Sequence, residues 1–156
     1  MAEQPASILV VDDERMIRWG LCRAREEAGY KADALGLSPY EALIDALVAK
    51  NLYILTANIA GLRTGGTVSD LWDDHYELAS AVAAEVLDIQ DWLVGTPVDR
   101  DRATTGMVTA FQGDPDHGTT GRSAPRRLER AIRHARTAGI ETPLLVEIGR
   151  EAGLAV

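Results

Sequence analysis

The chain has 156 residues, of which 46% are hydrophobic and 26% charged. This length suits one domain with a sizeable core, and the composition excludes an intrinsically disordered chain. The net charge of −8 at pH 7 opposes binding of nucleic acid by the surface as a whole. Cys22 has no second cysteine, which excludes a disulfide framework and a cysteine metal site. No hydrophobic run reaches the length of a membrane span and no signal-peptide pattern is present, so we expect a cytoplasmic protein without membrane contact.

The first part of the chain alternates short apolar runs with helical patterns. Residues 7–14 (SILVVDDE) place four consecutive apolar residues before three acids, which is typical of a strand buried on both faces of a parallel sheet. Ser38 and Pro39 suit the N-cap and the first position of a later helix. In chain order we expect a strand at 8–12, a helix at 15–28, a strand at 30–35, a helix at 38–49 and a strand at 51–55.

The second part continues this alternation with longer loops. Residues 124–138 form an amphipathic helical pattern, and Gly139 directly after it suits the C-cap. In chain order we expect a helix at 70–87, strands at 92–94 and 107–111, the helix at 124–138 and a last buried strand at 143–148. The pattern predicts one α/β domain over residues 1–156, a three-layer α/β/α sandwich with a doubly wound parallel sheet of five or six strands and flavodoxin-like topology.

Two acidic residues end the first predicted strand, where an open parallel sheet has its functional crevice. Asp12 and Asp13 are adjacent, and two carboxylates in that position repel each other unless a cation joins them. Mg²⁺ prefers such oxygen ligands, so the pair is a candidate magnesium site. A solvated acidic turn that caps the next helix explains the pair equally well.

Residues 8–30 (ILVVDDERMIRWGLCRAREEAGY) closely resemble the first strand and helix of response-regulator receiver domains of two-component systems, most of all nitrogen-regulator-type receivers. The similarity continues to Gly61. It implies a phosphorelay signalling fold in which Asp12 and Asp13 hold Mg²⁺. Residues 107–111 (MVTAF) resemble the fourth receiver strand, which implies that the hydroxyl of Thr109 orients the phosphoryl group.

Two positions depart from the receiver pattern. Thr56 stands where the family has its phosphoacceptor aspartate, and its hydroxyl is a poor nucleophile unless a base activates it. Glu147 stands where the family has a lysine, which reverses the charge next to a phosphoryl group. We therefore expect a pseudo-receiver that is not phosphorylated in the usual way and that binds Mg²⁺ weakly.

The spacing of the two threonines is too long for a receiver. Thr56 and Thr109 are 53 positions apart, whereas one helix and two short loops need roughly 25–30. An inserted segment explains the excess. A natural or engineered chimera, with a receiver-like part at 7–62 joined to a different α/β half at 63–156, explains it too.

The expected function is a signalling or interaction module rather than an enzyme. Its expected partner is a protein: a histidine kinase, another receiver or an output domain on a separate chain, with homodimerisation open and no direct contact with nucleic acid. The competing interpretation is a flavodoxin-like domain whose loops at 61–69 and 95–106 bind a small ligand or cofactor.

Three further groups of charged residues have two explanations each. Asp73, Asp74, His75 and Glu77 resemble a metal cluster, as do Asp114, Asp116 and His117, but both groups are also typical of solvated surface. Residues 122–136 hold six arginines and one histidine against a single Glu129. Such a run is either a solvated helix face or a contact for an acidic partner.

Overall fold

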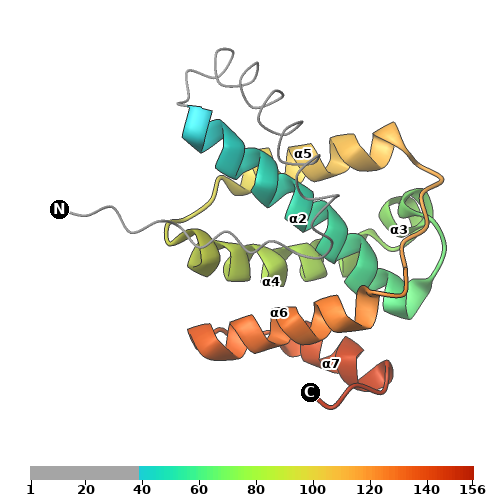
Figure 1. Ribbon diagram of the computed structural model, residues 1–156. Helices are drawn as coiled ribbons and strands as arrows, with labels where there is room; N and C mark the ends of the chain where they lie inside the picture. Colours follow the sequence, from blue (N-terminus) through green and yellow to red (C-terminus); the bar gives the residue numbers. More distant parts are fainter. Residues whose placement is uncertain (1–38) are drawn as a thin grey trace.

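The computed structural model describes residues 39–156, which form a bundle of helices around a long central one (Figure 1). The elements predicted at 8–12, 15–28 and 30–35, together with Asp12, Asp13 and Cys22, lie outside the described residues. The helices of the described part are α2 (Pro39–Thr64), α3 (Val68–Asp74), α4 (Tyr76–Val94), α5 (Arg100–Gly113), α6 (Ala124–Ala138) and α7 (Pro143–Glu151).

The predicted α/β sandwich is wrong, because residues 39–156 contain no β-strand. The segments expected as strands at 51–55, 92–94, 107–111 and 143–148 lie within α2, α4, α5 and α7. A short apolar run has the same appearance in a buried strand and in a buried turn of helix, so periodicity cannot separate the two. The division of the chain at residue 62 stays a prediction, although α2 continues through that position.

Helix α2 is the centre of the described part. It is 26 residues long and contacts α3, α4, α5, α6 and α7. In Figure 1, α5 lies on one side of α2, and α4 and α6 lie on the other. Because α2 packs against five helices, its apolar residues are not confined to one narrow stripe, and residues 52–55 form a continuous apolar run.

By length and composition alone, the segment Glu41–Thr64 is also apolar enough to cross a membrane, contrary to the sequence expectation that no segment is. The centre of a helical bundle requires a helix of the same kind, and α2 packs against each of the other described helices. Packing within the bundle accounts for part of its apolar character, since 33% of this apolar window is buried among the described residues.

The core of the described residues is mainly aliphatic, as the low aromatic content of 5% requires. A small aromatic cluster closes one end, where the ring of Phe111 lies 5.3 Å from that of Tyr53 and 5.7 Å from that of Trp72. The largest fully buried side chains of the core include Leu52, Ile59, Leu71, Met107, Leu128, Ile132, Leu145 and Ile148.

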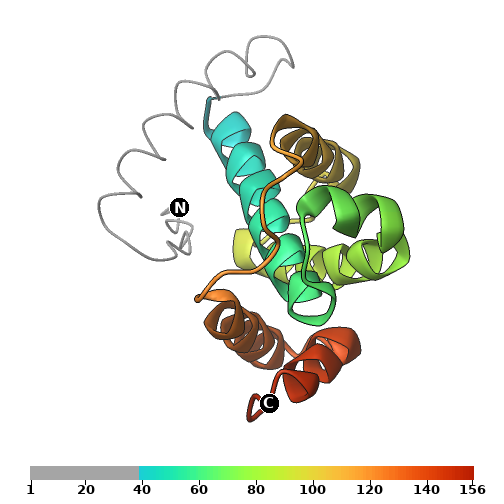
Figure 2. The same ribbon diagram turned by 90° about the vertical axis from the view of Figure 1, so that its right-hand side faces the viewer.

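Helices α6 and α7 lie side by side at one end of the bundle (Figure 2). Helix α6 ends at Gly139, whose φ of 70° is in the left-handed region that glycine adopts without a steric cost. Helix α7 begins against α4: the backbone N–H groups of Leu144 and Leu145 each donate to the carboxylate of Glu85 at 2.9 Å. A carboxylate at this position accepts hydrogen bonds from the free N–H groups of the first turn and is stabilised by the positive end of the helix dipole.

Candidate anion-binding face

The residues predicted from the receiver pattern lie on separate helices. Thr56 is in α2 and fully buried, and its Oγ1 has no hydrogen-bond partner among residues 39–156. Thr109 is exposed on α5, where its hydroxyl donates to the carbonyl oxygen of Thr105 at 2.8 Å. Glu147 is exposed on α7 and accepts a hydrogen bond from Arg63 at 2.9 Å. The receiver pattern would bring these three residues together around a parallel sheet. Residues 39–156 contain no strand, so the basis for grouping them is absent.

The two predicted magnesium ligands, Asp12 and Asp13, lie outside the described residues. Within residues 39–156, no group of three or more His, Cys, Asp and Glu side chains could hold a metal ion. This includes the two groups at 73–77 and 114–117, whose acidic and histidine residues are all exposed.

The basic run at 122–136 leads into and covers most of α6, and the helix expected at 124–138 is confirmed with those bounds. Its buried side is apolar and includes Leu128 and Ile132. Arg126, Arg130 and Arg133 share the opposite side, because residues spaced by four and three lie on one face of a helix. These three positions extend over roughly 10 Å of the helix axis. We call Arg126, Arg130 and Arg133, with the flanking Arg127 and His134, the α6 face.

The arginines of this run have no carboxylate partner in the part of the chain that the structure describes. Arginines on the other helices contrast with them. Arg63 pairs with Glu147 at 2.9 Å and Glu151 at 2.7 Å. Arg100 pairs with Asp88 at 2.7 Å and Asp91 at 2.6 Å. Arg102 pairs with Asp45 and Asp99.

One flank of the α6 face is bound to α2 by a polar network. The guanidinium Nη1 of Arg127 donates to Asn58 Oδ1 at 2.6 Å, and Asn58 Nδ2 donates to the carbonyl oxygen of Thr119 at 3.1 Å. The hydroxyl of Thr119 in turn lies 3.0 Å from the carbonyl oxygens of Gly65 and Gly66. The network fixes the loop before α6, and with it the start of the helix, against the end of α2.

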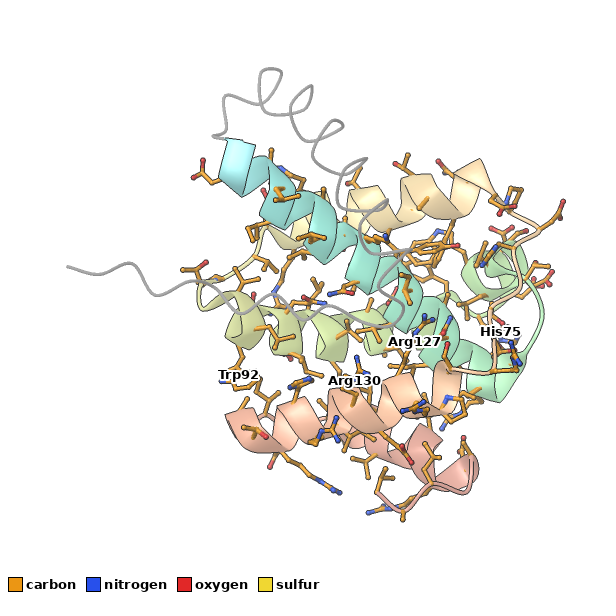
Figure 3. The ribbon with its side chains drawn as sticks, in the orientation of Figure 1. His75, Trp92, Arg127 and Arg130 are labelled. Carbon is orange, nitrogen blue, oxygen red and sulfur yellow. The ribbon has the colours of Figure 1, made fainter. Side chains whose placement is uncertain are left out.

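The other end of the α6 face meets α4 through two rings. The centroids of Trp92 and His134 are 6.0 Å apart, and the Nε2 atom of His134 is buried without a hydrogen-bond partner in the described part of the chain. Burial lowers the pKa of His134 below its usual range, and the charges of Arg133 and Arg130 lower that pKa further. In Figure 3, Trp92, Arg130 and Arg127 follow one another along the junction of α6 with α4 and α2.

The sequence signalled only part of this face. The basic run at 122–136 is evident from the sequence, which explains it either as a solvated helix face or as a contact for an acidic partner. Asn58 and Trp92 were not candidates, because Asn58 lies 69 positions before its partner Arg127 and neither residue belongs to a motif. The α6 face includes contacts of α6 with α2 and α4, and contacts between different helices do not follow from residue spacing along the chain.

No family model, curated protein or solved structure matches the chain. The resemblance to receiver domains therefore has no support beyond the short strings that suggested it, and the helical structure overturns it. The two functions built on a parallel sheet, a two-component pseudo-receiver and a flavodoxin-like ligand-binding domain, are also wrong, because the described residues contain no such sheet.

Proposed function

We propose that this helical bundle is a protein-binding module whose α6 face receives an acidic segment of a partner protein. The observation that carries the proposal is the absence of carboxylate partners for the arginines of α6 within residues 39–156, in a chain with a net charge of −8. A binding role, rather than a catalytic one, is what the face supports.

Four acids of the neighbouring helices α4 and α7 already have other partners. Glu85 caps α7, and Asp88 and Asp91 bind Arg100. Glu147 binds Arg63. None of these four carboxylates therefore neutralises the α6 face.

Arginine suits this role because its planar guanidinium binds a carboxylate through two parallel hydrogen bonds. An exposed pair contributes only about 0.2–1 kcal/mol, so several pairs must act together. Arg127 and Arg130 are half-buried, where the attraction is screened less than at the fully exposed Arg126 and Arg133. The α6 face combines both kinds of position.

An oligoglutamate peptide with a fluorescent label tests the proposal by fluorescence anisotropy. We expect binding that weakens as the salt concentration rises, and that weakens on the order of tenfold in the double variant Arg126→Glu, Arg133→Glu. Both arginines are exposed, so the helix remains packed through its buried side. The matched control is Arg150→Glu, which reverses an exposed arginine on α7 that forms no ion pair among the described residues.

Two outcomes contradict the proposal. One is equal affinity of the double variant and the control for the peptide. The other is displacement of the peptide by a single-stranded oligonucleotide at lower concentration than by unlabelled peptide, which would show that the face selects phosphates of nucleic acid. The net charge of −8 is the reason to expect the opposite order, because it repels a long polyanion.

A further inference from the structure

Two large hydrophobic side chains are exposed in the described residues, both on α4. Tyr76 at the start of the helix is 55% exposed and Trp92 near its end is 43% exposed. Tyr76 packs edge-on against Trp72, with centroids 4.9 Å apart, far along α4 from the α6 face. Trp92 instead contacts His134 and therefore lies directly beside that face.

We infer that Trp92 is the apolar anchor of the α6 face, so that the acidic segment of the partner carries an aromatic residue next to its carboxylates. This inference rests on the proposed function. Tryptophan, tyrosine and arginine are the residues most enriched among those that dominate binding energies. Trp92 and the unpaired arginines bring both kinds of residue to one junction between α4 and α6.

The charges around Trp92 permit an acidic ligand. The carboxylates nearest to it along α4 are Asp88 and Asp91, and both are bound by Arg100, at 2.7 and 2.6 Å. Their repulsion of a second acid is therefore reduced. On the other side of Trp92, α6 presents His134 and, one turn earlier, the half-buried Arg130.

The order of these groups along α6 sets the order of the partner's residues. His134, Arg130 and Arg126 follow one another at intervals of four residues, which is about 6 Å of helix rise per step. Two residues of an extended strand span about the same distance. An aromatic residue over Trp92 therefore places acids two and four residues further along an extended partner at Arg130 and Arg126.

Two labelled peptides test this arrangement. Both have two glutamates in alternate positions, and they differ only in a phenylalanine or a serine placed two residues before the first glutamate. We expect the wild-type chain to bind the phenylalanine peptide on the order of tenfold more tightly. In Trp92→Ala the two peptides should bind equally, and Trp92→Phe, which keeps an aromatic ring, should restore most of the preference. The matched control is Tyr76→Ala, which removes the other exposed aromatic side chain of α4 and should leave the preference intact.

The outcomes separate this inference from the proposed function. If both peptides bind with equal affinity and lose it in Arg126→Glu, Arg133→Glu, the acidic ligand stands and the role of Trp92 is wrong. If Trp92→Ala keeps the preference, or Tyr76→Ala abolishes it, the anchor is elsewhere. If neither peptide binds the wild-type chain, both proposals are wrong.

Discussion

Arg127 on α6 donates to Asn58 on α2 across 2.6 Å, and this hydrogen bond joins two helices whose residues are 69 positions apart. The other end of the Asn58 amide holds the loop before α6 through the carbonyl oxygen of Thr119, at 3.1 Å. One half-buried amide therefore orients the helix that carries the proposed binding face.

Replacing Asn58 with alanine should lower the free energy of unfolding by roughly 1.5–3 kcal/mol, because a hydrogen bond to a charged group is lost and Arg127 is left unpaired. Urea denaturation followed by circular dichroism measures the change. Asn51→Ala is the matched control, since Asn51 is a half-buried asparagine of the same helix whose side chain forms no hydrogen bond among the described residues. Equal losses in the two variants would show that the network does not stabilise the fold.

Gly61 is required by the close approach of the loop before α6 to α2. A Cβ atom at this position would lie 2.5 Å from both the Cβ and the Oγ1 atoms of Thr119. Gly61→Ala should therefore destabilise the fold by about 1–3 kcal/mol through overpacking. Gly113→Ala, in α5, meets no atom within 4 Å and should instead be neutral or slightly stabilising, because alanine favours helix. Thermal melting of the two variants compares them, and a stable Gly61→Ala protein would mean that the loop before α6 is not held against α2.

Thr56 has a fully buried hydroxyl without a hydrogen-bond partner in the described structure. Valine has nearly the same shape and removes the unpaired polar group, so Thr56→Val should raise the free energy of unfolding by about 1 kcal/mol. Thr109→Val is the control, because the Thr109 hydroxyl is exposed and bonds to the carbonyl oxygen of Thr105 in its own helix. We expect that control to change stability by less than about 0.5 kcal/mol. A loss of stability in Thr56→Val would indicate that the hydroxyl has a partner.

His134 should titrate below the usual value of about 6.5, because burial and the charges of Arg133 and Arg130 lower its pKa. Between the two pKa values of His134, the unfolded chain binds more protons than the folded chain. The contribution of neutral His134 to folding stability is therefore present above its unfolded pKa and is lost as the pH falls through its folded pKa. NMR titration of the His134 ring measures the pKa directly. The double variant Arg130→Gln, Arg133→Gln should move it upward while leaving the effect of burial, and an unchanged pKa would contradict the assigned contribution of these charges.

An acidic peptide on the α6 face should raise the pKa of His134 by the same electrostatics, since it neutralises the arginines that lower it. By linkage, peptide binding then takes up protons, and the affinity increases as the pH falls toward the pKa of His134. Comparing the peptide affinity of wild type and His134→Gln across this pH range measures the coupling. The variant should lose the part of the pH dependence that arises from this side chain.

Helix α6 follows from local features of the sequence. An apolar side repeated at helical spacing, an arginine-rich opposite side and a glycine directly after the last turn are all local features, and the helix lies at 124–138 as they predict. The start of α2 at Pro39 was predicted as well, but the end of that helix was not. Residues 52–55 are continuously apolar within α2, which packs against five other helices, and a run of this kind is also typical of a buried strand.

Whether residues 52–55 form a strand or a turn of helix depends on what packs around them. This choice is therefore visible only in the packed bundle. The tertiary structure also decided the composition of the α6 face. The contact of Trp92 with His134 and the hydrogen bond from Arg127 to Asn58 join residues of different helices, so no spacing along the chain announces them. Only the packed bundle shows that Glu85, Asp88 and Asp91 of α4 already have partners, and that the arginines of α6 have no carboxylate partner in the described part.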